Sequence, residues 1–250
     1  MSSGGETRCA LVTGAAGGIG RAIATRLESE GLRVVAADLE PDSDGPGHPV
    51  ACDLTGAEGN RAAVQAALDE FGRLDVLVPN AGVQHVAPID EFAEERWDQL
   101  IALLLTSPFL LAKYAWSALA ESGEGRYVAV ASAHGLVASP HKVAYVAAKH
   151  GLLGLVKTLA LEGADRGITA TAVCPGFVRT PLVENQIADQ ARANDLPSER
   201  VLEEVILAPH AIKRLIEPEE VAAVVALLAG PEGSAFTGAA LPMDLGWTAR

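Results

Sequence analysis

The sequence predicts an α/β protein in which about seven parallel strands form one doubly wound sheet, with helices on both faces and a helical lid. Short apolar segments alternate along the chain with longer segments of helical periodicity. The apolar segments are almost continuously hydrophobic, as expected of parallel strands that are buried on both faces. No low-complexity linker or internal repeat divides residues 1–250, so we expect a single domain.

The order of these segments defines the expected elements. Strands are expected at residues 8–13, 32–37, 50–52, 74–78, 126–132, 168–173 and 239–243. Helices are expected at residues 18–29 and 60–71, within 94–119, and at 143–162. Residues 1–7 are expected to be a flexible tail. Residues 181–217 fit the alternation poorly, and we expect them to form a helical lid over the ligand crevice or an ordinary surface insertion.

Composition excludes several classes of function. The chain carries 32 acidic and 19 basic residues, a net charge of −13, which disfavours nucleic acid because the phosphates would be repelled. Cys9, Cys52 and Cys174 form no CxxC pair and have no metal-ligand spacing, so no metal is expected. The most apolar stretch, residues 100–112, is shorter than the roughly 20 residues of a membrane span, and Pro108 interrupts it. With no visible signal peptide, we expect a cytoplasmic protein without a membrane partner.

A glycine-rich segment, residues 13–20, connects the first expected strand to the first helix. Gly14 permits a tight turn, Gly18 lets the backbone approach a pyrophosphate, and Gly20 allows close packing of the helix on the strand. Amides at the helix N-terminus then face the phosphates. Asp38 ends the next strand about 20 residues on, where it can bind the adenosine ribose and repel a 2′-phosphate. The pattern predicts a dinucleotide site that prefers NAD to NADP.

A second group of polar residues can transfer a proton. Tyr145 and Lys149 are four residues apart, on one face of an expected helix. A nearby ammonium lowers the pKa of a phenol, so Tyr145 can act as general base or acid on a hydroxyl or carbonyl group. Ser132 ends the fifth expected strand and can stabilise the substrate oxygen. A Ser-His hydrolase is disfavoured, because Ser132 is not in a G-x-S-x-G turn and His134 is not obviously placed as its base.

Together these residues resemble the short-chain dehydrogenase/reductase family over nearly the whole chain. The resemblance is carried by the 13–20 turn, Asp38, Asp53, Asn80-Ala81-Gly82, Ser132, Tyr145-x-x-x-Lys149 and Pro175-Gly176. It implies a Rossmann-type fold, NAD as cofactor, and usually a homotetramer. It also implies cofactor contacts, with Asp53 at the adenine, from Gly14, Gly18, Ile19, Gly20, Asp38, Asp53, Leu54, Asn80, Gly82, Tyr145, Lys149, Pro175, Val178 and Thr180.

The chain is further similar to the D-3-hydroxybutyrate dehydrogenases within that family. This narrower resemblance is carried by residues 80–88, 132–137, Lys142, residues 180–187 and Gly246-Trp247. It implies interconversion of D-3-hydroxybutyrate and acetoacetate in ketone body metabolism. It also implies that a substrate carboxylate is held by Gln84, His134, Lys142 and Gln186, and that Ser132, Tyr145 and Trp247 complete the substrate site. A lysine with neutral hydrogen-bond donors can orient such a small anion even in an acidic protein.

Two alternatives remain open. The chain could be another reductase of the same family, acting on 3-oxoacyl, polyol or steroid substrates, or a catalytically silent nucleotide-binding protein. The silent alternative is suggested only by Leu104, which stands where the family usually has an asparagine. That asparagine helps to hold a water that connects the lysine to solvent, and a leucine side chain cannot form such hydrogen bonds.

Overall fold

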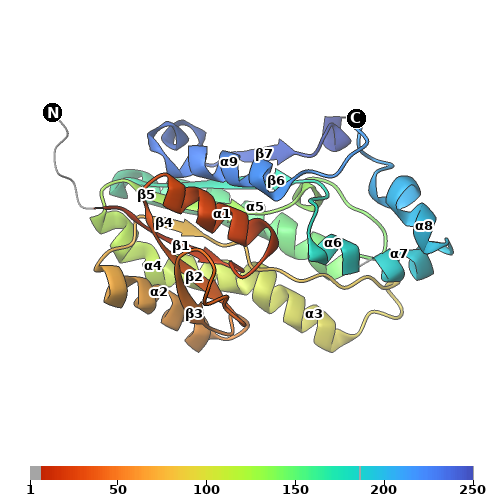
Figure 1. The fold of residues 1–250 in the computed structure, drawn as a ribbon, viewed down its shortest axis with the longest axis horizontal. Helices are drawn as coiled ribbons and strands as arrows, with labels where there is room; N and C mark the ends of the chain where they lie inside the picture. The colour runs from red at the N-terminus through yellow and green to blue at the C-terminus, as the bar shows by residue number, and fades with distance from the viewer. Residues whose placement is uncertain (1–6, 186, 250) are drawn as a thin grey trace.

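A seven-stranded parallel sheet forms the centre of the computed structural model, which describes residues 7–185 and 187–249 (Figure 1). Its strands are β1 (Cys9–Thr13), β2 (Arg33–Asp38), β3 (His48–Ala51), β4 (Val76–Val78), β5 (Gly125–Val130), β6 (Ile168–Pro175) and β7 (Ala240–Met243). Their spatial order is β3-β2-β1-β4-β5-β6-β7, which confirms the expected doubly wound topology. The order reverses between β1 and β4, and ligands bind at the carboxyl ends of the strands beside such a reversal.

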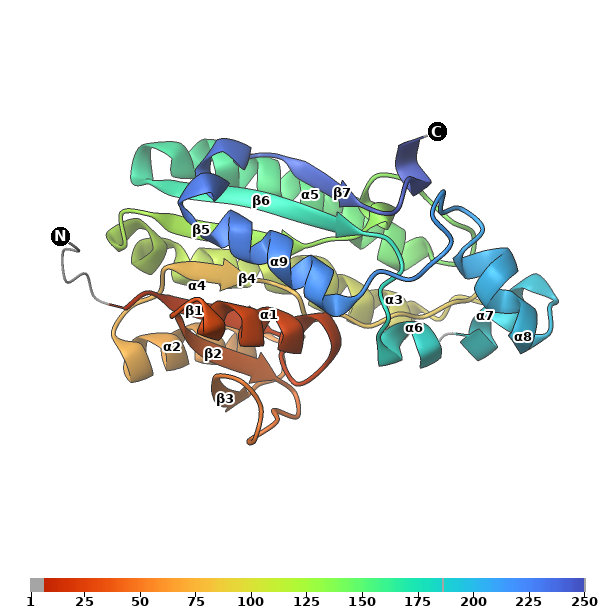
Figure 2. The ribbon, with the colours of Figure 1, turned by 45° about the horizontal axis from the view of Figure 1, so that its top comes forward.

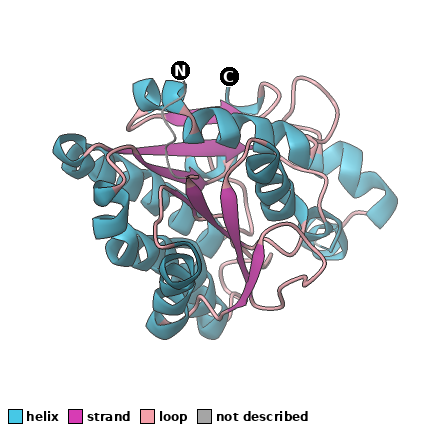
Figure 3. Cartoon of the chain, turned by 60° about the vertical axis from the view of Figure 1, so that its left-hand side comes forward, coloured by secondary structure: helices cyan, strands magenta, loops and turns pink. Residues whose placement is uncertain are grey.

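Helices cover both faces of the sheet (Figure 3). Helices α1 (Gly18–Ser29) and α9 (Pro218–Ala229) lie on one face, and α2 (Ala57–Phe71), α4 (Ser107–Glu121) and α5 (Val143–Gly163) lie on the other. Successive strand residues point to opposite faces. Leu11 therefore packs in the core with Leu111 and Leu152, whereas Val12 packs in the core with Ile23 and Val225.

Helix α1 has the expected bounds, but three other expectations are corrected. Helix α9 was not expected, although Pro218 and a capping box between Glu217 and Glu220 mark its start. Strand β3 begins at His48, before the strand expected at residues 50–52; Pro49 is tolerated there because β3 is an edge strand. Strand β5 ends at Val130, so Ser132 lies beyond the strand and caps a short 3₁₀ helix.

Pro108 does not interrupt the apolar helix, contrary to the expectation. Helix α3 (Glu94–Ile101), a π-helical segment (Ala102–Thr106) and α4 form one continuous helical run. The Ser107 N–H donates to Ala102 O, and this wider turn precedes Pro108 in the first turn of α4, where a proline is tolerated. The run Glu94–Glu121 is long and apolar enough to cross a membrane by length and composition alone. Leu111 and Leu119 on this run are fully buried against the sheet.

Residues 181–217 form short helices beyond the carboxyl ends of the strands (Figure 2). They include α6 (Pro181–Asn185), α7 (Ile187–Asn194) and α8 (Ser198–Val201). This segment has its own apolar cluster, and its base is closed where the Ile216 N–H donates to Phe177 O at 3.0 Å. The helical character of the segment is confirmed, while its action as a lid stays a prediction. The expected tail lies outside the described residues, apart from Thr7.

Candidate active site

The glycine-rich turn after β1 is packed too closely to accept side chains. A Cβ atom on Gly20 would lie 2.0 Å from Gly14 O, and one on Gly14 would lie 2.8 Å from Ala81 Cα. Gly14 and Gly18 also have φ of +66° and +53°, in the left-handed region. The backbone at the start of α1 is therefore uncovered, and its amides can be reached by a phosphate.

Asn80 joins this turn to the end of β4. Its Nδ2 donates to Thr13 O at 2.9 Å, and its backbone N–H donates to Thr13 Oγ1 at 3.0 Å. Gly82 follows in the same segment, and a Cβ atom there would lie 3.1 Å from Leu104 Cδ2. The segment expected to lie along the cofactor is thus fixed directly beside the glycine turn.

Two carboxylates lie at or just after the carboxyl ends of β2 and β3. Asp38 Oδ2 accepts from the Ala16 N–H at 3.0 Å, which holds the carboxylate against the glycine turn. The exposed Asp53 accepts hydrogen bonds from the side chain and the backbone of Thr55, and these lower its pKa. Leu54, next to it, is buried. The turn and these carboxylates form a donor and acceptor set that fits the phosphates and the adenosine of a dinucleotide.

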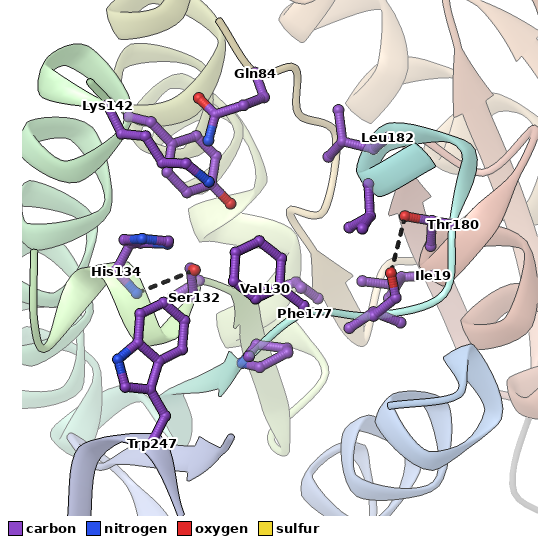
Figure 4. Close-up of a pocket in the computed structure, with 16 residues that line it drawn as sticks. Ile19, Gln84, Val130, Ser132, His134, Lys142, Phe177, Thr180, Leu182 and Trp247 are labelled. Carbon is purple, nitrogen blue, oxygen red and sulfur yellow. Dashed lines mark hydrogen bonds between the residues drawn. The ribbon is translucent and has the colours of Figure 1, made fainter. Parts of the chain in front are cut away.

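A cavity at the carboxyl ends of β5 and β6 gathers the expected catalytic and substrate-binding side chains (Figure 4). Of the expected residues, it is lined by Ile19, Gln84, Ser132, His134, Lys142, Tyr145, Pro175, Val178, Thr180 and Trp247. Lys149 borders a second, smaller cavity instead. Gln186, which was expected to hold the carboxylate, lies outside the described residues.

Tyr145 and Lys149 project from α5 near the end of β5. Lys149 Nζ lies 5.6 Å from the centroid of the Tyr145 ring and donates to Val130 O at 2.9 Å. Burial raises the pKa of Tyr145, while the hydrogen bond with the Ser132 side chain lowers it. The dominant influence on this phenol is therefore burial and not the expected effect of Lys149. Burial also lowers the pKa of Lys149 to about 8.

A second buried lysine enters the cavity from the residue before α5. Lys142 is only 2% exposed, its Nζ lies 4.9 Å from the centroid of the Phe177 ring, and burial lowers its pKa to about 8. His134 Nε2 lies 3.0 Å from Ser139 Oγ. Burial first, and then the charges of Lys142 and His150, lower the pKa of His134 to about 3. Near neutral pH the cavity thus holds a cationic lysine and a neutral imidazole.

Aromatic side chains form part of the cavity wall. The rings of Phe177 and Trp247 stack with centroids 5.6 Å apart, and His134 meets Trp247 edge-on at 4.9 Å. Phe177, Leu182 and Val183 line the cavity but were not among the expected site residues. The sequence feature that could have identified Phe177 as a site residue is its position directly after Pro175-Gly176. The cavity therefore combines a cation with a largely apolar wall, which suits a small substrate with one charged end.

Comparison with known proteins defines the class. Residues 14–248 match the family model described as enoyl-(acyl carrier protein) reductase. The chain belongs to the short-chain dehydrogenase/reductase family, whose members are oxidoreductases that use NAD or NADP.

The similar proteins include several dehydrogenases. The chain is 43% identical to D-beta-hydroxybutyrate dehydrogenase of Rhizobium meliloti (strain 1021), over 98% of this chain and all of that protein. It is 40% identical to the protein of the same name from Cupriavidus necator, over 97% of this chain and 98% of that protein. The ligand-free structure of Thermoplasma acidophilum aldohexose dehydrogenase superposes with a TM-score of 0.90 at 31% identity, over 98% of this chain and 95% of that one.

The contact between Gly20 and Gly14 generates the first prediction. We expect Gly20→Ala to displace the turn and to raise the Kd for NADH at least about tenfold, which corresponds to about 1.4 kcal/mol. Gly17→Ala is the matched control, because a Cβ atom there meets nothing within 4 Å. Fluorescence titration with NADH measures both variants, and equal affinities would contradict this account of the turn.

Proposed function

We propose that the protein interconverts D-3-hydroxybutyrate and acetoacetate with NAD as the hydride carrier. The observation that carries the proposal is the buried Lys142 ammonium in the cavity that Tyr145 and Ser132 also line. A cationic donor that lines the cavity can form a charge-assisted hydrogen bond with a carboxylate, so a site of this kind favours an anionic ligand. The similarity to two D-beta-hydroxybutyrate dehydrogenases supports the same substrate.

The remaining lining fits such a substrate. Gln84 and the neutral His134 can hydrogen-bond the carboxylate beside Lys142. The aromatic wall of Phe177 and Trp247 can pack against the short alkyl end. A small hydroxy acid has little surface to bury, so these few polar contacts must supply most of its orientation.

The catalytic roles are assigned to Ser132, which follows β5, and to Tyr145 and Lys149 on α5. Tyr145 takes the proton of the substrate hydroxyl, or returns it to the carbonyl in the reverse direction. Ser132 hydrogen-bonds the same oxygen and stabilises its developing charge. Lys149 supplies a positive charge behind the phenol, and a charge of this sign favours the phenolate. Bound NAD supplies the hydride acceptor and a further positive charge near Tyr145.

Loss of the Tyr145 hydroxyl tests the reaction. We expect Tyr145→Phe to lower kcat for NADH formation from D-3-hydroxybutyrate by about 10²- to 10⁴-fold, because no base remains for the hydroxyl proton. Tyr114→Phe is the matched control. Tyr114 lies on α4, where the Arg61 guanidinium of α2 covers its ring, and it does not line the cavity. A panel of short hydroxy acids, each as both enantiomers, is assayed with both variants. Wild-type activity in Tyr145→Phe would refute the mechanism, and activity on other substrates alone would refute this substrate.

The low pKa of Lys142 predicts a pH dependence of substrate binding. Lys142 is an ammonium below its pKa of about 8 and loses its charge above it. The substrate carboxylate stays ionised throughout this range. We therefore expect KM for D-3-hydroxybutyrate to be low below pH 8 and to rise above it. Lys142→Met should raise KM strongly and remove this pH dependence; an unchanged KM would contradict the assigned role.

We propose that the Asp38 carboxylate makes the protein prefer NAD to NADP. Its carboxylate is fixed by the Ala16 amide beside the turn, where a 2′-phosphate would meet a negative charge. We expect NADPH to bind at least about tenfold more weakly than NADH. Asp38→Asn removes the charge with little change in shape, and it should reduce the difference in Kd between NADPH and NADH. Titration of wild type and variant with both nucleotides tests this, and tighter binding of NADPH by wild type would overturn it.

A further inference from the structure

One member of the aromatic wall, Trp247, comes from a short turn that follows β7. Trp247 projects from this turn into the cavity, where its ring stacks on the ring of Phe177 (Figure 4). Trp247 is only partly buried, so packing alone gives it less support than a core side chain receives. Whatever fixes the turn therefore also fixes this part of the cavity wall.

The turn is organised by one buried carboxylate, that of Asp244. This side chain is 6% exposed and accepts hydrogen bonds from the N–H groups of Gly246 at 3.0 Å and Thr248 at 2.9 Å, and from the Thr248 hydroxyl. Burial alone would raise the pKa of Asp244, but these hydrogen bonds outweigh it and hold the pKa below its usual value. Hydrogen bonds to an ionised group are roughly twice as strong as neutral ones. Asp244 therefore fixes both neighbours of Trp247 in the chain.

The same turn is docked on the end of the lid segment. Leu245 O accepts from two successive amides, those of Ala211 at 2.8 Å and Ile212 at 3.1 Å. A Cβ atom on Gly246 would lie 2.8 Å from Ala211 Cβ. Leu245 has a φ of +53°, in the left-handed region, and such a conformation persists only where the surroundings hold it in place. The turn and the end of the lid thus form one unit.

His210 joins this unit to the aromatic wall. Its side chain is fully buried, and its ring centroid lies 5.9 Å from the centroids of both Phe177 and Trp247. A Cβ atom on Gly176 would lie 3.0 Å from His210 Nε2 and 3.2 Å from Asp244 Cα. Three segments that are far apart in the sequence therefore pack closely around Gly176, which leaves the wall little space in which to shift.

We propose that Asp244 is a positioning residue for Trp247, and that the turn it holds restricts the substrate to a short alkyl chain. The proposal rests on the proposed function, because it concerns the alkyl end of the hydroxy acid. Asp244 does not line the cavity, so it acts through Trp247. A fixed apolar wall can discriminate one methylene group by about 10- to 200-fold, and a wall that moves loses this discrimination.

Substrate chain length provides the test. D-3-Hydroxypentanoate is one methylene group longer than D-3-hydroxybutyrate, and we expect wild-type kcat/KM for the longer acid to be at least about tenfold lower. Asp244→Asn keeps the shape of the side chain but replaces one acceptor oxygen by an NH₂ group, which cannot accept from Gly246 or Thr248. We expect it to reduce the preference at least about threefold, mainly through KM. A general loss of folded enzyme would instead lower kcat/KM for both acids equally.

Three further variants complete the series. Trp247→Ala removes the wall itself and should abolish the preference. Thr248→Val removes one hydrogen bond to Asp244, should reduce the preference less, and serves if Asp244→Asn does not fold. Thr158→Val is the matched control, because it removes an exposed hydroxyl that donates to Gly154 O on α5. It should keep the wild-type preference.

Tryptophan fluorescence tests the anchoring without catalysis. The chain has three tryptophans, so Trp247 alone remains in a Trp97→Phe, Trp116→Phe background. In this background Asp244→Asn should increase the quenching of Trp247 by acrylamide and shift its emission to the red, because the ring leaves the wall. Unchanged quenching, or an unchanged chain-length preference, in Asp244→Asn would overturn the proposal. Absence of NADH formation from any hydroxy acid would instead refute the proposed function, and quenching would then decide the role of Asp244.

Discussion

The close approach of Gly20 to Gly14 is the constraint on which the rest of the site depends. No side chain fits between these residues, so α1 begins directly on the end of β1 with its amides uncovered. Asn80 then ties the end of β4 to the same turn through Thr13. The point at which the strand order reverses thereby becomes one rigid unit, and both Asp38 and the substrate cavity are positioned relative to it.

A second unit at the same sheet edge is built from β5 and the first turns of α5. Ser132 caps the short 3₁₀ helix after β5 by accepting the His134 N–H, which fixes both side chains toward the cavity. Lys142, Tyr145 and Lys149 then follow within two turns of α5. Lys142 and Tyr145 reach the substrate cavity, while Lys149, one helical turn after Tyr145, borders the smaller cavity.

The sheet and most site residues were predictable because their signals are local. Strand-like apolar runs, the spacing of Gly14, Gly18 and Gly20, and the pair on α5 can each be recognised within a few residues. The aromatic wall could not be predicted in this way, since Phe177 and Trp247 meet only in the folded chain. Helix α9 was missed because its apolar run is too uniform to show a clear period, although its capping signals were present.

The two lysines show how one physical effect can serve two purposes. Burial lowers the pKa of each to about 8, because both lose hydration. Lys142 lies in the cavity, where its ammonium can orient the carboxylate of the proposed substrate. Lys149 is held by Val130 O behind Tyr145 and borders the smaller cavity instead. Its ammonium lies 5.6 Å from the centroid of the Tyr145 ring, a distance at which a buried positive charge favours the phenolate.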